Sequence, residues 1–274
     1  MSAASQIVRF ALAEDVGAGD ATTQACVPAD HLADGIFLAR QPLVLAGTAL
    51  LAEIYAQAGG VQTLTLLKPD GATVEAEEVF ATVSGSARTL LTCERVALNF
   101  LQRLSGVATL ARSFAERVAG TGCQVLDTRK TTPGLRLLEK QAAAAGGVTN
   151  HRMGLWDAIL IKNNHISAAG GVAQALQAAA SHSPLPIEIE VRTEAERDEA
   201  LAHGARHLLL DNLTPEQARV WIDAVGGRAT VELSGNISLA TVRAYAETGA
   251  QFVSAGAITH SAPAVDISFR LSLR

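Results

Sequence analysis

Cysteine and aromatic residues are both scarce in this chain of 274 residues. The three cysteines, Cys26, Cys93 and Cys123, are far apart in the sequence. This spacing excludes a disulfide framework and a cysteine-based zinc site, and we expect three buried free thiols in a reducing compartment. Aromatic residues make up 4% of the chain and hydrophobic residues 49%, so alanine, leucine and valine must build the core. This composition is typical of an α/β protein.

Long apolar runs and an excess of positive charge are also absent. No apolar stretch is long enough to cross a bilayer. The first twenty residues lack the apolar segment of a signal peptide, so the sequence predicts a cytoplasmic protein. The formal net charge of −5 argues against a nucleic acid or an anionic membrane as partner.

From about residue 107 onward, short aliphatic segments alternate with alanine-rich segments of helical periodicity. Thr193 and Thr214 are good helix N-caps, and Gly204 and Gly249 are typical helix stops. Repeated β–α units predict parallel strands, and six or seven units predict an open, incomplete α/β barrel. The expected strands are 124–127, 157–162, 187–191, 207–211, 229–233 and 251–254, and the expected helices are 135–145, 168–181, 194–203, 215–225 and 239–248.

The first hundred residues lack this alternation and mix strand, helix and turn signals. We predict an N-terminal α+β sandwich domain over residues 1–106, followed by the barrel over residues 107–263. A long amphipathic helix at 91–110 joins the two. The final segment, 264–274, is strand-like and is a candidate to return to the first domain.

Charged and hydroxyl residues crowd the stretch LDTRKTTPGLR, which carries Asp127, Arg129, Lys130 and Arg136. In a chain that is acidic overall, such a local group of cations indicates a site for an anion. In parallel α/β barrels the loops after the strands build the active site. Other polar residues and glycines of this chain also fall at the ends of expected strands: Lys162, Glu190, Asp211, Ser234, Gly235, Asn236 and Gly256.

These residues divide into three chemical groups. Arg129, His151, Arg152 and Lys162 form a cationic set suited to carboxylates. Glu190 and Asp211 are suited to Mg²⁺ held through water, or to sugar hydroxyls. Glu188 in the same strand is expected on the opposite face from Glu190, so that one of the two faces solvent. The segments LSGN and SAGA offer backbone N–H groups for a phosphate. Together the groups indicate a sugar phosphate that reacts with an acid.

Several segments carry a family resemblance. They are ALAEDVGAGDATT, LLTCERVALNFLQRLSGVAT, LDTRKTTPGLRLLEK, GGVTNHRMGLWDAILIKNNHI, EIEV, LLLDN, VELSGN and SAGAITHS. In order, they resemble the signature segments of the quinolinate phosphoribosyltransferases, also called nicotinate-nucleotide pyrophosphorylases (carboxylating), over nearly the whole chain. The resemblance implies a homodimer with Mg²⁺ as cofactor. It also implies transfer of phosphoribosyl from phosphoribosyl pyrophosphate to quinolinate, giving nicotinate mononucleotide, pyrophosphate and CO₂.

The resemblance also implies roles for individual residues. The quinolinate-binding cations of the family fall on Arg129, His151, Arg152 and Lys162, with Arg95 supplied by the partner subunit. The positions that handle phosphoribosyl pyrophosphate and its metal fall on Lys130, Glu190 and Asp211, which are the expected catalytic residues. The phosphate-binding positions fall on Ser234, Gly235, Asn236 and Gly256.

The chain departs from the family at two positions near these residues. Asn163 stands where the family usually has aspartate, and Val148 stands where it has a third glycine. Three alternatives stay open. One is a related phosphoribosyltransferase with another acceptor, of the type associated with molybdate transport. The others are a barrel lyase that forms a Schiff base at Lys162, and a non-catalytic sugar-phosphate sensor. The sequence also leaves open an oligomer larger than the dimer.

Overall fold

The computed structural model describes residues 2–274, and they form two compact units. The N-terminal unit comprises residues 2–112, 131–147 and 261–274. The barrel unit comprises residues 113–130 and 148–260. The chain therefore passes between the two units four times. No helix in the described part of the chain combines the length and the apolar character that a membrane span requires.

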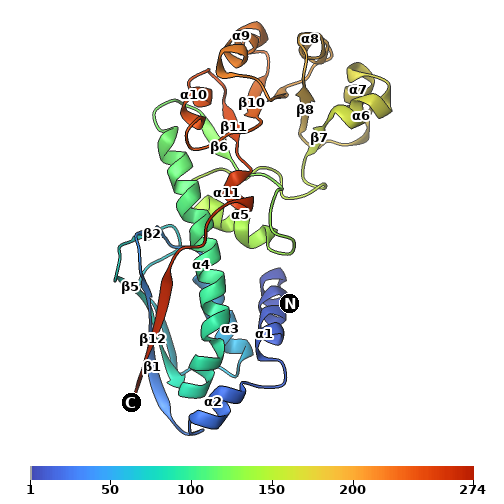
Figure 1. Cartoon of the computed structure of the whole chain (residues 1–274). Coiled ribbons are helices and arrows are strands. Elements are labelled where there is room, and N and C mark those ends of the chain that lie inside the picture. Colours follow the sequence, from blue (N-terminus) through green and yellow to red (C-terminus); the bar gives the residue numbers. More distant parts are fainter. Residues whose placement is uncertain (1) are drawn as a thin grey trace. The chain divides into compact units, whose positions relative to one another are not determined.

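An antiparallel sheet of four strands, in the order β12-β1-β5-β3, forms the base of the N-terminal unit. The last strand of the chain, β12, pairs with β1 from Ala39↔Ile267 to Ala33↔Leu273. Helices α1, α3 and α4 lie on one face of this sheet (Figure 1). The strands are β1 Leu32–Ala39, β2 Leu43–Val44, β3 Thr63–Leu66, β4 Thr73–Val74, β5 Val79–Ser86 and β12 Ile267–Leu273. The helices are α1 Ala3–Val16, α2 Ala21–Cys26, α3 Ala49–Gln57, α4 Ala87–Arg117 and α5 Arg136–Ala145.

The longest helix, α4, contains the predicted segment 91–110 and extends it at both ends. Leu90, Ala97, Leu101, Leu104 and Ala108 are all buried and follow one another at intervals of seven, four, three and four residues, which places them along one side of the helix. The apolar side explains why the helix is stable, since burial of such a stripe rather than intrinsic propensity supports most protein helices.

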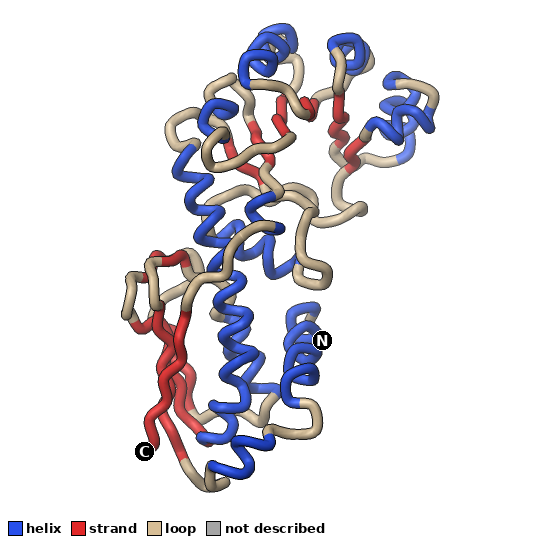
Figure 2. Tube along the Cα trace, in the orientation of Figure 1, coloured by secondary structure: helices blue, strands red, loops and turns tan. Residues whose placement is uncertain are grey.

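Six parallel strands, in the order β6-β11-β10-β9-β8-β7, form the sheet of the barrel unit. Within the described chain the edge strands β6 and β7 do not pair with each other, so the barrel is open, and the predicted fold class is confirmed. Helices lie on the outer side of the strands (Figure 2). The strands are β6 Gln124–Leu126, β7 Ile159–Ile161, β8 Ile187–Val191, β9 His207–Asp211, β10 Thr230–Ser234 and β11 Phe252–Ser254. The helices are α6 Asn163–Ala169, α7 Val172–His182, α8 Glu194–Ala202, α9 Pro215–Val225, α10 Val242–Ala246 and α11 Ala257–His260.

Two predicted helix caps are confirmed. The Thr193 side chain accepts the Glu196 N–H at the start of α8, and Thr214 forms a capping box with Gln217 at the start of α9. The helix predicted at 168–181 is wrong at its start. Gly170 and Gly171 have φ angles of 91° and 147°, which separate α6 from α7 because helices require negative φ.

Two further expectations need correction. The helix predicted at 239–248 is shorter, since α10 covers Val242–Ala246. Cys93 and Cys123 are buried as expected, but Cys26 is exposed at the end of α2. Cys26 is the last residue of a helix of six residues, of which only Thr23 is buried.

Candidate active site

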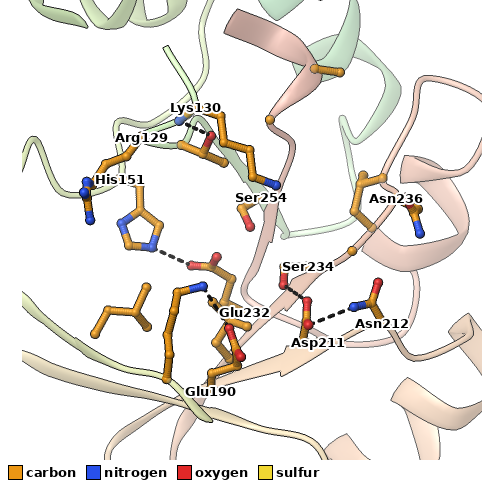
Figure 3. A pocket seen from close by; sticks show the side chains of 18 of the residues that line it. Arg129, Lys130, His151, Glu190, Asp211, Asn212, Glu232, Ser234, Asn236 and Ser254 are labelled. Carbon is orange, nitrogen blue, oxygen red and sulfur yellow. Dashed lines mark hydrogen bonds and ion pairs between the residues drawn. The ribbon is translucent and has the colours of Figure 1, made fainter. Parts of the chain in front are cut away.

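A cavity of about 800 Å³ opens at the carboxyl ends of the parallel strands in the barrel unit. Figure 3 shows side chains from several loops turned toward it. Arg95 lies on α4 in the N-terminal unit, is exposed, and is not among the lining residues of the described chain. The other eleven predicted site residues all line the cavity: Arg129, Lys130, His151, Arg152, Lys162, Glu190, Asp211, Ser234, Gly235, Asn236 and Gly256.

The cationic side of the cavity contains a guanidinium with unused hydrogen-bonding capacity. Arg152 Nη1 donates to the Ala158 carbonyl at 3.0 Å. Its Nε is buried and has no hydrogen-bond partner among the described residues. Burial, and then the nearby positive charge of Arg129, lower the pKa of Arg152, although an arginine stays charged at neutral pH. The guanidiniums of Arg129 and Arg152 lie near each other, and the buried Nε–H of Arg152 lacks an acceptor in the described part of the chain. A bound anion would offset the two positive charges and accept that hydrogen bond.

His151 lines the cavity and lies between the half-buried Glu188 and the buried Glu232. Its Nε2 is 3.3 Å from Glu188 Oε2 and 3.4 Å from Glu232 Oε2 (Figure 3 shows the contact with Glu232). Burial alone lowers the pKa of His151, but hydrogen bonds to the two glutamates and their charges outweigh it and raise the pKa to about 9. The Arg152 N–H donates to Nδ1 at 2.7 Å, which favours the neutral ring. The two carboxylates outweigh this hydrogen bond and keep the ring protonated, because hydrogen bonds to charged groups are roughly twice as strong as those between neutral groups.

The expectation that Glu188 and Glu190 lie on opposite faces of the strand, with one of them turned to solvent, is wrong. Residues two apart in a strand point to the same face, so Glu188 and Glu190 of β8 both turn inward. Burial is the main cause that raises the pKa of Glu188, and the neighbouring Glu232 adds to it. The ligand atoms of His151, Glu188 and Glu232 lie within 4.8 Å of one another, which would suit a metal ion, but the histidine already joins the two acids by hydrogen bonds.

Asp127 and Arg136, which precede and follow the predicted anion loop, do not line the cavity. Asp127 is fully buried and accepts the His151 N–H at 2.8 Å and the Asn150 side-chain amide at 2.7 Å. It therefore fixes the backbone that carries His151. Arg136 begins α5 in the N-terminal unit, where its Nε donates to Thr131 Oγ1 at 3.0 Å.

The acidic side of the cavity is built from neighbouring strands. Glu190 on β8 is 4% exposed, and its Oε2 lies 2.9 Å from Lys162 Nζ at the end of β7. Asp211 at the end of β9 accepts the Ser234 hydroxyl at 2.7 Å and the Asn212 side-chain amide at 2.8 Å (Figure 3). Both acids are thus held in place by side chains that also line the cavity.

The loop after β10 takes an unusual backbone conformation. Gly235 and Asn236 have φ angles of 101° and 52°. A Cβ at Gly235 would lie 2.2 Å from Asn212 Oδ1, so glycine is required both by the conformation and by the close approach. Successive backbone N–H groups in such turns make anion-binding concavities. At Gly256 a Cβ would lie 2.9 Å from Lys130 Cδ, so this glycine lets the lysine side chain pass close to the β11–α11 turn.

The two departures in the sequence lie outside the cavity lining. Asn163 is exposed at the first residue of α6. Val148 is buried, and it is the preceding residue, Gly147, that has a positive φ angle, of 99°. The cavity also has lining residues that received no role from the sequence, among them Glu232 and Asn212. Glu232 precedes Ser234 by two residues on β10, and this spacing was a usable signal that both face the same side.

Comparison with known proteins gives consistent results over nearly the whole chain. Residues 20–105 match the family model described as "Quinolinate phosphoribosyl transferase, N-terminal domain", and residues 107–270 match the corresponding C-terminal domain. A curated relative is quinolinate phosphoribosyltransferase [decarboxylating] 1b of Nicotiana tabacum, which is 38% identical over 97% of this chain and 81% of the relative.

Two solved structures are similar over almost their full length. NadC from Streptococcus pyogenes has a TM-score of 0.94 and 38% identity, over 98% of this chain and 96% of that one. The nicotinate-nucleotide pyrophosphorylase from Francisella tularensis has a TM-score of 0.95 and 37% identity over the same shares.

Proposed function

Because this chain belongs to the quinolinate phosphoribosyltransferase family, we propose that it transfers phosphoribosyl from phosphoribosyl pyrophosphate to quinolinate. Loss of one carboxyl group as CO₂ then gives nicotinate mononucleotide, with pyrophosphate as the other product. The observation that carries the proposal is one cavity with cations on one side, and acids and a phosphate-type turn on the other.

The cationic side fits the two adjacent carboxylates of quinolinate. Arg129, Arg152 and Lys162 together with protonated His151 replace the hydration that a dicarboxylate loses on burial. The unused Arg152 Nε supplies a donor for one carboxylate oxygen. Fixing both carboxylates orients the ring nitrogen toward the ribose, and such positioning is worth several orders of magnitude in rate.

The acidic side fits the phosphoribosyl group. Gly235, Asn236 and Gly256 offer backbone N–H groups to the 5′-phosphate, and Lys130 offers a cation to the diphosphate. Glu190 and Asp211 stabilise the positive charge that develops on the ribose when the C1–O bond to pyrophosphate breaks.

The ring nitrogen then bonds to C1 and becomes cationic. Its positive charge stabilises the electron pair that stays on the adjacent ring carbon when the carboxyl group departs as CO₂, and a proton then bonds to that carbon in place of the group. None of these steps requires a covalent bond to the protein.

Mg²⁺ is the proposed cofactor. Oxygen ligands from Glu190 and Asp211 suit this hard cation. Their oxygens already accept hydrogen bonds or ion pairs from Lys162, Ser234 and Asn212, so the two acids fit an ion held through its own water molecules. When bound, Mg²⁺ supplies charge neutralisation to the leaving pyrophosphate.

We also propose a cytoplasmic homodimer in which Arg95 reaches the cavity of the partner subunit. Support comes from the family resemblance and from the exposure of Arg95 on α4. The Schiff-base alternative is disfavoured by Lys162, whose ammonium group is engaged by Glu190 rather than available as a free amine nucleophile.

An endpoint assay tests the function. The protein is incubated with phosphoribosyl pyrophosphate, Mg²⁺ and either quinolinate or nicotinate, and nicotinate mononucleotide and CO₂ are quantified. We expect both products from quinolinate and no nucleotide from nicotinate, which lacks the second carboxylate. Nucleotide from nicotinate alone would overturn the acceptor assignment, and no product from either acid would overturn the proposed reaction.

A further inference from the structure

Arg192 lies directly after β8, beside the two acids proposed to hold Mg²⁺. Its Nη2 is 3.0 Å from Glu190 Oε1 and 4.0 Å from Asp211 Oδ2. Glu190 and Asp211 come from the neighbouring strands β8 and β9, which bring their carboxylates to one side of the cavity (Figure 3). The guanidinium is thus within ion-pairing distance of both acids at once.

Each of the four carboxylate oxygens of the two acids has a partner in this arrangement. Glu190 Oε1 pairs with Arg192 and Glu190 Oε2 with Lys162 at 2.9 Å. Asp211 Oδ1 accepts the Ser234 hydroxyl, and Oδ2 accepts the Asn212 amide. Two cationic and two anionic groups give this cluster a formal charge of zero, so it attracts a free divalent cation far less than two bare carboxylates would.

Lys162 alone would already neutralise the buried Glu190. Arg192 is therefore a second cation beside the two acids, hydrogen-bonded to Glu190 and within ion-pairing distance of Asp211, and its charge also acts on any ion that the two acids share. The Arg192 side chain is 48% exposed, and its backbone N–H is fixed by Glu196 Oε2 at 2.8 Å. The backbone of Arg192 is therefore held by a hydrogen bond, whereas its half-exposed guanidinium can move away from Glu190 and Asp211.

We propose that Arg192 is a built-in competitor of the divalent ion at Glu190 and Asp211. Without substrate, its guanidinium occupies the place between the two acids. The ion enters together with the diphosphate of the substrate, whose negative charge replaces the acids as the partner of Arg192. This inference depends on the proposed function for the identity of the ion and substrate, but its main test does not.

The test measures Mn²⁺ binding to the substrate-free protein, from the electron paramagnetic resonance signal of free Mn²⁺. Wild type, Arg192→Gln, Arg192→Lys and Arg206→Gln are compared. Arg206 is the matched control, because it is an exposed arginine just before β9, at the end of the strand opposite Asp211. We expect Arg192→Gln to bind Mn²⁺ about tenfold more tightly, the effect of removing one charge near a divalent ion in a water-exposed site. Arg192→Lys and Arg206→Gln should resemble wild type.

Equal Mn²⁺ affinity in all four proteins would overturn the proposal. Unchanged Mn²⁺ affinity with weaker binding of phosphoribosyl pyrophosphate to Arg192→Gln would also overturn it, and would assign Arg192 to the diphosphate instead. Thermal unfolding of each variant establishes that it is folded, and Arg192→Met replaces Arg192→Gln if the latter does not fold. Because no acceptor acid is present, the metal titration can fail or succeed independently of the quinolinate assay.

Discussion

Replacing Glu232 by glutamine should lower the pKa of His151. The substitution keeps the size of the side chain and an acceptor for His151 Nε2, and it removes one of the two charges next to that nitrogen. Glu232 is 4% exposed, so solvent does little to screen its charge. Loss of that charge should therefore be felt directly by the imidazole ring.

The size of the effect follows from the shift of His151 itself. Its pKa rises from 6.5 to about 9, a difference of about 2.5 units. Glu188 and Glu232 lie at nearly equal distances from Nε2 and together must also offset the burial of the ring. Neutralising one of them should lower the pKa of His151 by at least about one unit, or about 1.4 kcal/mol.

The sign of the pH dependence follows from the same shift. The pKa of His151 is higher in the folded protein than in the unfolded chain, so the folded protein binds the proton more tightly. The resulting stabilisation is fully present below about pH 6.5 and is lost as the pH rises through about 9. The wild-type free energy of unfolding should fall over this interval, and that of Glu232→Gln should fall less.

The assay is a pH titration of the imidazole resonances by NMR, with the His151 signal assigned from its loss in His151→Gln. Glu216→Gln is the control, because it also removes one negative charge, but from an exposed residue at the start of α9. A wild-type His151 that titrates at or below 6.5 would refute the reasoning. It would mean that the Arg152 N–H bond to Nδ1, which favours the neutral ring, governs the site.

Three other predictions concern the site and its scaffold. Arg95→Ala and Arg152→Ala should each abolish activity, but a random mixture should regain about a quarter of it, since about half of the dimers combine the two variants and each of these has one intact site of its two. Gly235→Ala should raise the KM for phosphoribosyl pyrophosphate and destabilise the fold by about 1–3 kcal/mol, because alanine is strained at a φ of 101° and its Cβ would clash with Asn212. Thr214→Ala should lower the free energy of unfolding by about 1 kcal/mol, as measured in urea, because α9 loses its N-cap.

Each of these predictions has its own control. The mixing experiment is repeated with each variant alone, and a mixture no more active than its components argues against shared sites. Gly227→Ala has a φ of 73° and open space around the added Cβ, so it isolates backbone strain; equal effects at both glycines would exclude a role for the Asn212 contact. Thr214→Ser keeps the hydroxyl and should retain most of the stability; a loss equal to that of alanine would contradict the capping explanation.

Local signals were sufficient for much of the barrel unit. Thr193 and Thr214 mark helix starts because a cap depends on residues three positions apart. The ends of the strands also followed from the sequence, since the carboxyl edge of a parallel sheet collects the residues after every strand. This geometry is why so many of the predicted polar residues meet in one cavity.

The failures involved register and tertiary distance. Glu188 was placed on the opposite face from Glu190, although residues two apart in a strand share a face. Arg136 was grouped with Arg129 by sequence proximity, but the chain passes into another compact unit between them. The position of Arg192 between two acids depends on Asp211 from the next strand, and no local pattern of the sequence reports such an approach.

The pairing of β12 with β1 has a consequence for the order of synthesis. β1 lies near the start of the chain, whereas β12 covers residues 267–273. During synthesis, more than two hundred residues are therefore translated after β1 before the strand that pairs with one of its edges exists. An open strand edge is a template for pairing with other chains. The nascent protein should therefore be prone to aggregate until its last strand emerges, and a premature stop before Ile267 should yield an insoluble product even though the barrel unit is already complete.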